Sequence, residues 1–460
     1  MAGDTIAVLD KFSGEAIARV PAASQEDVRS AVSRAQKAFA DYSRWPAHRR
    51  AAVLEKTSRL ISERREELAR TICREAGKAW RYSLAEADRA AETFKFAAEE
   101  AKRIHGETVP LDASPSGEGR LAFTLRMPVG VVAAVTPFNF PLNLVAHKVA
   151  PALAAGDTVV LKPATAAPLS ALALQGLLRE AGLPEGVLEV VIGGGATVGN
   201  WLVSDPRPAA ATFTGSPAVG LEITRQAGLK KVALELGNNG GVIIEADSDW
   251  EAAVPRCVTA AFANSGQVCI SLQRVYVHES IAGPFTEKVL KAAAGLKTGN
   301  PLDRDCDVGP MISADEAARA EDWVKEAVQA GARVLAGGGR KGALMEPTVL
   351  DRVRPDMKVV CQEVFAPVVS LLPYRDFPEA LAALADTPYG LQAGVYTRDI
   401  AKALEAARRL DFGGVMVNDT PLFRTDNMPY GGNRGSGIGR EGVRYAVEEL
   451  TSLRLVVIKP

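Results

Sequence analysis

An alternation of strand-like and helix-like segments between residues 128 and 237 most constrains how this chain can fold. Short apolar runs rich in β-branched residues, such as VGVVAAV, DTVVLKP, AAATFTGS and KKVALELG, are separated by segments of helical pattern such as SALALQGLLREAG. Strands that alternate with helices in this way pair in parallel. The pattern predicts an α/β fold with a doubly wound parallel sheet, which binds dinucleotides at the carboxyl ends of its strands.

The segments on either side of this core have other patterns. Residues 24–104 have helical spacing, with Ser24 as a candidate N-cap and a stop at Gly77. Residues 106–127 contain turn residues between short alternating stretches, which predicts a hairpin excursion. The last residues, LTSLRLVVIKP, alternate as an exposed strand does, and an unpaired strand edge invites a second chain.

The length of 460 residues exceeds what one hydrophobic core usually serves, so two or three domains are expected. After Gly237 a second α/β pattern begins and continues to about residue 442. We therefore expect a dinucleotide-binding domain from residues 1–105 and 128–237, a second α/β domain from 238–442, and a β arm from 106–127 and 443–460.

Charge and composition limit the classes of partner that this chain is expected to bind. The 54 basic and 55 acidic side chains nearly cancel, which leaves no broad field for nucleic acid or an anionic membrane, so a small molecule is the expected partner. No apolar run approaches the roughly 18 residues that span a bilayer, and the N-terminus has no signal-peptide pattern, which predicts a cytoplasmic protein. Five scattered cysteines without a CxxC pair and four separated histidines predict no metal site.

Three residues carry the candidate chemistry. Cys269 in NSGQVC supplies a thiol nucleophile, Glu235 in LELGNNG a carboxylate base, and Asn139 in TPFNFPLN an amide donor for an oxyanion. Each alone has an ordinary alternative, namely a buried inert cysteine, a strand-end carboxylate and a turn residue. Their order along one chain resembles the aldehyde dehydrogenase superfamily, and the resemblance extends from about residue 5 to the C-terminus.

The resemblance implies NAD(P)-dependent oxidation of a small aldehyde to the carboxylic acid. Cys269 would form a thiohemiacetal and then a thioester, with the oxyanion held by Asn139 and the backbone N–H of Cys269, and Glu235 would activate the hydrolytic water. An ordinary thiol is mostly protonated near neutral pH, so a neighbour must lower the pKa of Cys269 or accept its proton. Coenzyme A-acylating semialdehyde dehydrogenases, which lack this glutamate, are one alternative, and a non-enzymatic structural oligomer is another.

The resemblance also places the cofactor, NAD or NADP. Thr165 stands where NAD-preferring relatives commonly carry a glutamate, so NADP is admissible. The usual ELGG reads Glu235, Leu236, Gly237, Asn238 here, which predicts a different backbone path after the base. The residues that match cofactor positions are Lys162, Thr165, Gly195, Gly199, Gly215, Ser216, Leu236, Glu363 and Phe365.

The stretch NDTPLFRTDNMPYGG resembles members that oxidise short hydroxylated or anionic aldehydes such as lactaldehyde, glycolaldehyde or glyceraldehyde phosphates. Arg424 is a candidate anchor for an anionic tail, because guanidinium pairs with carboxylate, phosphate or sulfonate. The alternative is a structural arginine. The segment Pro429 to Gly442 is expected to support the pocket from below. In the family the hairpin and the tail form an oligomerisation arm, which predicts a homodimer or homotetramer.

Overall fold

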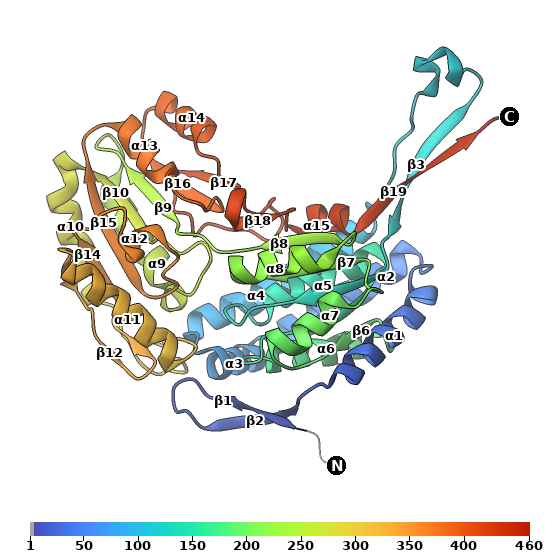
Figure 1. Ribbon diagram of the computed structural model, residues 1–460, viewed down its shortest axis with the longest axis horizontal. Coiled ribbons are helices and arrows are strands. Elements are labelled where there is room, and N and C mark those ends of the chain that lie inside the picture. The colour runs from blue at the N-terminus through green and yellow to red at the C-terminus, as the bar shows by residue number, and fades with distance from the viewer. Residues whose placement is uncertain (1–3) are drawn as a thin grey trace.

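The computed structural model describes residues 4–460, and residues 1–3 lie outside the described part. Two β-sheets, each covered by helices, form the body, and a long two-stranded arm projects from it with the C-terminus near its tip (Figure 1). The predicted α/β fold with parallel sheets is confirmed. Among residues 4–460 no helix combines the length and apolar character needed to cross a bilayer.

The first sheet has the doubly wound arrangement expected from the sequence. Its strand order is β18-β8-β7-β4-β5-β6, and all neighbours are parallel except β18, which is antiparallel to β8. Chain order reverses between β4 and β7, so the carboxyl ends of these two strands flank a switch point where ligands bind. The strands are β4 (Val131–Val135), β5 (Thr158–Lys162), β6 (Leu188–Val190), β7 (Ala210–Thr214), β8 (Lys231–Glu235) and β18 (Gly437–Ile438).

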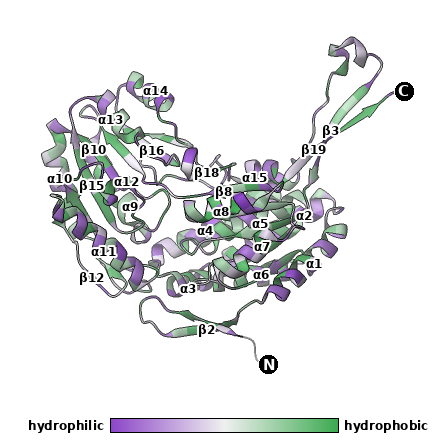
Figure 2. Cartoon of the chain, viewed as in Figure 1, coloured by the Kyte–Doolittle hydropathy of each residue, from purple (hydrophilic) through white to green (hydrophobic). Residues whose placement is uncertain are grey.

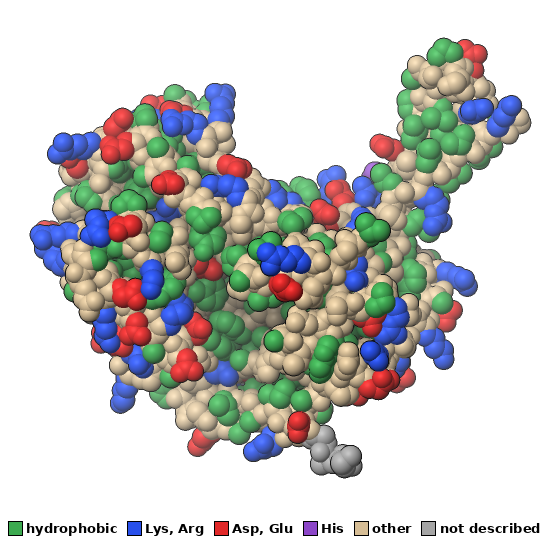
Figure 3. All heavy atoms as spheres, viewed as in Figure 1, with side chains coloured by type: hydrophobic (Ala, Val, Ile, Leu, Met, Phe, Trp, Pro, Cys, Tyr) green, Lys and Arg blue, Asp and Glu red, His purple; other side chains and the backbone are tan. Residues whose placement is uncertain are grey.

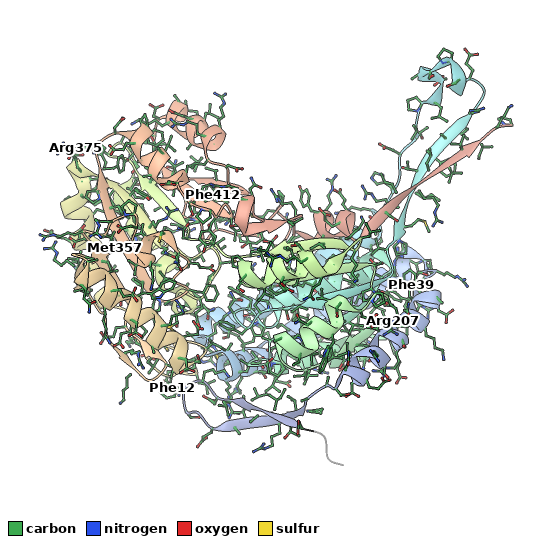
Figure 4. The ribbon with its side chains drawn as sticks, in the orientation of Figure 1. Phe12, Phe39, Arg207, Met357, Arg375 and Phe412 are labelled. Carbon is green, nitrogen blue, oxygen red and sulfur yellow. The ribbon has the colours of Figure 1, made fainter. Side chains whose placement is uncertain are left out.

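Helices cover both faces of the first sheet. Ser24 caps the first helix through a capping box with Asp27, and Gly77, with φ 73°, ends the third, as the sequence predicts. Arg207, labelled in Figure 4, donates to Ser33 and ties the loop after α7 to α1. The helices are α1 (Gln25–Tyr42), α2 (Ala47–Glu63), α3 (Arg65–Ala76), α4 (Trp80–Ala101), α5 (Asn143–Ala155), α6 (Leu169–Ala181), α7 (Asn200–Ser204) and α8 (Pro217–Ala227).

The second sheet has seven strands in the order β11-β14-β15-β10-β9-β16-β17, parallel except for β11. Its strands are β9 (Gly241–Ile244), β10 (Arg274–His278), β11 (Arg333–Ala336), β14 (Thr348–Asp351), β15 (Val368–Tyr374), β16 (Gln392–Tyr396) and β17 (Gly414–Val417), with a small ribbon of β12 (Arg340–Lys341) and β13 (Leu344–Met345). Its helices are α9 (Trp250–Phe262), α10 (Glu279–Ala294), α11 (Ala314–Gln329), α12 (Lys358–Cys361), α13 (Phe377–Ala385) and α14 (Ile400–Arg409).

The arm pairs β3 (Leu121–Pro128) with β19 (Thr451–Ile458) in an antiparallel ladder along their whole length. The residues before β3 turn back along it, and the N–H of Thr124 donates to Glu107 O at 2.8 Å. Both strands are largely hydrophobic in colour (Figure 2). Far from the arm, β1 (Thr5–Leu9) and β2 (Ala16–Pro21) form a separate hairpin.

The chain returns to the first sheet before it enters the arm. After β17 it adds β18 to the edge of the first sheet, and α15 (Val443–Glu449) then packs on α4 and α5 with Val443 and Val447 in the same core. The predicted domain boundaries remain a prediction. They do not describe the return of β18 and α15 to the first sheet and its helices.

Candidate active site

Cys269 lies where two cavities meet. A cavity of about 290 Å³ is lined by Phe138, Asn139 and Cys269 together with residues of the first sheet's carboxyl edge, and a cavity of about 170 Å³ lies beyond the sulfur. The space-filling view shows a hollow with hydrophobic side chains between the two halves of the body (Figure 3). A thiol shared by a larger and a smaller cavity can react with a small molecule in one while a second molecule occupies the other.

A strained turn presents Cys269 to both cavities. Directly after α9, Asn264 and Ser265 adopt left-handed φ values of 51° and 56°, and Gly266 follows with 69°. A Cβ on residue 266 would lie 2.0 Å from the carbonyl oxygen of Ala366, so only glycine fits. Such strain is common at functional sites and persists where the surroundings fix the backbone.

Asn139 lies beside this turn, as its predicted role requires. Its Nδ2 donates to Gln267 O at 3.0 Å, and Asn264 Nδ2 donates back to Asn139 O at 3.2 Å. An amide carries two N–H groups, so one remains for a ligand near Cys269. The geometry brings Asn139 and Cys269 together, although the oxyanion role itself remains a prediction.

Glu235 ends β8 and points into a buried cluster of charges. One carboxylate oxygen, Oε2, is buried and has no hydrogen-bond partner among residues 4–460. Burial, and then the charge of Glu441, raise the pKa of Glu235 well above its usual value, while Arg424 and Lys148 oppose this shift. The charge of Glu235 contributes to the raised pKa of Cys269, so the two groups share one electrostatic environment.

The thiol of Cys269 is not activated in this structure. Burial raises its pKa to about 12, against the lowering effects of the Tyr430 hydrogen bond and the charge of Arg424. The thiol is therefore protonated near neutral pH. Of the two possibilities that the sequence leaves open, acceptance of the proton by a neighbouring base agrees better with these surroundings than a lowered pKa does.

Five of the predicted cofactor residues line the larger cavity: Gly215, Ser216, Leu236, Glu363 and Phe365. Ser216 caps the start of α8, where free backbone N–H groups suit a phosphate. Glu363 Oε1 accepts from the N–H of Asn238 at 3.0 Å. The φ of Asn238 is not positive, so the backbone here does not require the second glycine of the usual ELGG.

The other four predicted cofactor residues gather around the end of β5. The side chain of Lys162 lies next to Gly199, Gly195 and Gly199 bound a π-helical turn, and Thr165 Oγ1 donates to Gly193 O at 2.6 Å. The ammonium of Lys162 has no ion-pair partner within residues 4–460, and burial lowers its pKa to about 8. An uncompensated cation close to a helix start fits the phosphates and ribose of a dinucleotide.

Arg424 lies in the wall of the smaller cavity but is already paired. Its guanidinium donates to Glu441 Oε2 at 2.9 Å and stacks 3.6 Å above the ring of Tyr430. Its substrate role remains a prediction. Two further cations, Lys78 and Arg89, line the same cavity, and no local pattern singles out either of them. Arg89 belongs to a regular helical pattern, and Lys78 follows the helix stop at Gly77.

Tyr430 is a site residue that the sequence analysis did not single out. The segment from Pro429 was expected to support the pocket from below, yet Tyr430 Oη lies 2.9 Å from Cys269 Sγ. The two residues are 161 positions apart, and no spacing rule connects them. A tyrosine beside the glycines of PYGG was the only available signal.

A doubly wound sheet with a cofactor-sized cavity at its carboxyl edge, and a thiol between that cavity and a small one, defines a nicotinamide-dependent oxidoreductase. The family model described as the aldehyde dehydrogenase family matches residues 1–456, and the chain belongs to that family. The chain is an enzyme that oxidises an aldehyde with NAD or NADP. Neither alternative, coenzyme A acylation or a purely structural oligomer, finds support in the comparisons.

Similar proteins include the 3-sulfolactaldehyde dehydrogenase of Priestia aryabhattai, 48% identical over 98% of this chain and 94% of the relative. The lactaldehyde dehydrogenase of Methanocaldococcus jannaschii is 41% identical over 98% of this chain and 96% of the relative. Among solved structures, a glyceraldehyde-3-phosphate dehydrogenase of the same archaeon complexed with NADP has a TM-score of 0.96 and 40% identity, with 100% of both chains covered. An aldehyde dehydrogenase from Bacillus cereus with NAD⁺ has a TM-score of 0.95 and 34% identity, covering 99% of this chain and 93% of that one.

Proposed function

We propose that this enzyme oxidises a short hydroxylated or anionic aldehyde to the carboxylic acid, with Cys269 as nucleophile, Asn139 as oxyanion donor and Glu235 as general base. The observation that carries the proposal is the position of the Cys269 thiol, in the wall of both the cofactor-sized cavity and a small cavity of about 170 Å³. The smaller volume suits an aldehyde of a few carbons. The names of the lactaldehyde and sulfolactaldehyde relatives support the same class of substrate.

The residues divide the reaction between them. Sγ of Cys269 attacks the carbonyl carbon, its proton passes to Glu235, and the Asn139 amide and the backbone N–H of Cys269 donate to the new alkoxide. When bound, the nicotinamide supplies the hydride acceptor. Glu235 releases that first proton to solvent. It then takes a proton from the water that attacks the thioester and returns it to the sulfur as the thiol leaves. Burial raises the pKa of Glu235, and its carboxylate is therefore a stronger base than an exposed one.

Cations in the smaller cavity support an anionic substrate tail. The side chain of Arg89 is 26% exposed, and two of its nitrogens donate to Asp426, which leaves the guanidinium further donors. Lys78 pairs with Glu86 and lies 3.4 Å from the centre of the Phe140 ring. Arg424 is the third candidate, although Glu441 already holds it. A sulfonate, carboxylate or phosphate would meet these groups in the wall of the smaller cavity.

The cofactor preference and the assembly belong to the same proposal. Thr165 carries no charge that would repel a 2′-phosphate, and Lys162 near it is free to attract one, which supports NADP beside NAD. The proposed location of the enzyme is the cytoplasm. We also propose a homodimer or homotetramer with the arm between subunits, because both strands of the arm expose leucines.

Reduction of NAD and NADP, followed by absorbance, tests the proposal with a panel of lactaldehyde, 3-sulfolactaldehyde, glyceraldehyde 3-phosphate and propanal, each with and without coenzyme A. We expect the hydroxylated and anionic aldehydes to have higher kcat/KM than propanal, and steady turnover to need no coenzyme A. A higher kcat/KM for propanal than for all three others would contradict the substrate class. A requirement for coenzyme A would contradict hydrolysis by Glu235.

A further inference from the structure

One polar side chain in the smaller cavity has the nucleophile as its only hydrogen-bond partner. Among residues 4–460 the hydroxyl of Tyr430 bonds to Cys269 Sγ alone, at 2.9 Å. The cations that line the same cavity are each paired with a carboxylate: Lys78 with Glu86, Arg89 with Asp426, and Arg424 with Glu441. The Tyr430 hydroxyl is therefore the group in this cavity whose bond is lost when the sulfur reacts.

The surroundings fix the Tyr430 ring before any substrate binds. The side chain is buried, and two backbone hydrogen bonds join Tyr430 to Glu441. The N–H of Tyr430 donates to Glu441 O at 3.0 Å, and the N–H of Glu441 donates to Tyr430 O at 2.6 Å. The Arg424 guanidinium covers one face of the ring, and Val268, Ile270 and Leu391 belong to the same cluster of packed side chains. The hydroxyl consequently keeps its place next to the sulfur while the substrate changes.

Attack on the aldehyde changes what the sulfur offers to this hydroxyl. Once sulfur is bonded to the carbonyl carbon, C1, it has no proton to donate and accepts only weakly, as a thioether does. C2 is then two bonds from sulfur and a hydroxyl on C2 three bonds away, within reach of a group that lies 2.9 Å from the sulfur. A buried O–H without a partner is unfavourable, and a C2 hydroxyl would provide one.

We propose that the Tyr430 hydroxyl binds the C2 hydroxyl of the substrate and makes the enzyme selective for 2-hydroxyaldehydes over aldehydes without that group. The inference rests on the proposed function and deepens it, because it assigns the hydroxylated part of the substrate to one named residue. The anionic tail is left to the cations in the wall of the same cavity. Tyr430 thereby becomes a specificity-determining residue, separate from the groups that carry out the reaction.

The test compares kcat/KM for 2-hydroxypropanal, 3-hydroxypropanal and propanal in the wild type and in Tyr430→Phe. In the wild type we expect 2-hydroxypropanal to exceed both others by roughly 10- to 100-fold, the factor that corresponds to one buried hydrogen bond. In Tyr430→Phe we expect the kcat/KM for 2-hydroxypropanal, divided by that for either other aldehyde, to fall to within about threefold of unity. The change should come chiefly from loss of activity on 2-hydroxypropanal. Tyr445→Phe, on α15 and outside both cavities, removes a hydroxyl elsewhere and should leave the ratio unchanged.

The outcomes separate this inference from the proposed function. Equal kcat/KM for 2-hydroxypropanal and 3-hydroxypropanal in the wild type would overturn the inference without the use of any variant. An unchanged ratio in a folded Tyr430→Phe variant would also overturn it, as would equal losses on all three aldehydes, which would assign Tyr430 to the thiol instead. Wild-type protein that oxidises none of the aldehydes on the full panel would contradict the proposed function itself.

Discussion

At the scale of residues, burial controls the protonation of the two groups on which the proposed chemistry depends. The same loss of solvent raises the pKa of the Cys269 thiol to about 12 and the pKa of Glu235 above its usual range. A protonated thiol is a poor nucleophile, whereas a carboxylate of raised pKa is a better proton acceptor. The proposed mechanism therefore requires Glu235 for deacylation and also uses it in the first step.

Substitution of these two residues should separate the half-reactions. Cys269→Ala should abolish the first burst of reduced cofactor, because no thiohemiacetal forms. Glu235→Gln should keep a burst amplitude close to one equivalent per site, formed more slowly because the acceptor of the thiol proton is lost. It should slow the steady rate by roughly 100-fold or more, because the thioester persists. Rapid mixing with absorbance detection measures both phases. A steady rate unchanged in Glu235→Gln would remove Glu235 from its role.

Gly266 permits a second prediction at this scale. Because a Cβ there would lie 2.0 Å from Ala366 O, Gly266→Ala should displace the turn that carries Cys269, with a cost of roughly 2 to 4 kcal/mol in the free energy of unfolding. Thermal melting and alkylation of Cys269 measure the two effects. Gly176→Ala is the control, since it lies within α6 and has open space for a Cβ. Equal melting temperatures for both variants would show that residue 266 tolerates a side chain.

At the scale of elements, the carboxyl ends of the first sheet's strands bring together residues that the proposal assigns to the cofactor and to the reaction. Ser216 follows β7 and begins α8, Lys162 ends β5, and Glu235 ends β8. In a parallel sheet these ends lie along one edge. The alternation of strands and helices was sufficient to predict this edge, because strand patterns and turns are local properties of a sequence.

The parts that could not be predicted depend on contacts between distant segments. Tyr430 reaches Cys269 only because β18 returns to the edge of the first sheet, and a two-residue strand has too weak a pattern to be recognised. Arg89 faces the smaller cavity because α4 packs beside α5, and Lys78 lies in the connection between α3 and α4; helical periodicity alone orients neither side chain. The role of Cys269 was predicted from the resemblance to a family. The residues by themselves indicated only that a thiol, a carboxylate and an amide were available.

Lys162 at the end of β5 should make cofactor binding depend on pH. Burial lowers its pKa to about 8, so the ammonium is charged below that pH and becomes neutral as the pH rises through it. If the charge attracts the nucleotide, the Kd for NADP should be nearly constant below pH 7 and should rise above pH 8 by up to about tenfold per pH unit. Titration of the intrinsic fluorescence with NADP measures this dependence without substrate.

Lys162→Arg provides the matched control for that titration, because a guanidinium stays charged throughout this range. Its Kd should change little between pH 7 and pH 9, whatever its absolute value. The same rise of Kd above pH 8 in the arginine variant would assign the dependence to another group.

At the scale of the whole molecule, the arm has no core of its own. Leu453, Leu455 and Val457 lie on one face of β19, and each is about half exposed, while Leu121 and Leu125 are exposed on β3. A two-stranded ribbon is at best marginally stable alone in water. Apolar side chains on an extended ribbon that projects from the body indicate a surface for association rather than an independent fold.

The arm therefore yields the prediction on assembly. Light scattering coupled to size exclusion should give the wild type a mass that is two or four times the 48.7 kDa of one chain, whereas Leu455→Glu should shift the protein toward the single-chain mass by placing a charge on the apolar face. Val328→Glu, an exposed position on α11, is the matched control and should keep the wild-type mass. Because the larger and smaller cavities lie away from the arm, the dissociated Leu455→Glu protein should still bind NADP. A single-chain mass for the wild type would contradict the predicted assembly, and retention of the full mass in Leu455→Glu would place the subunit interface on another surface.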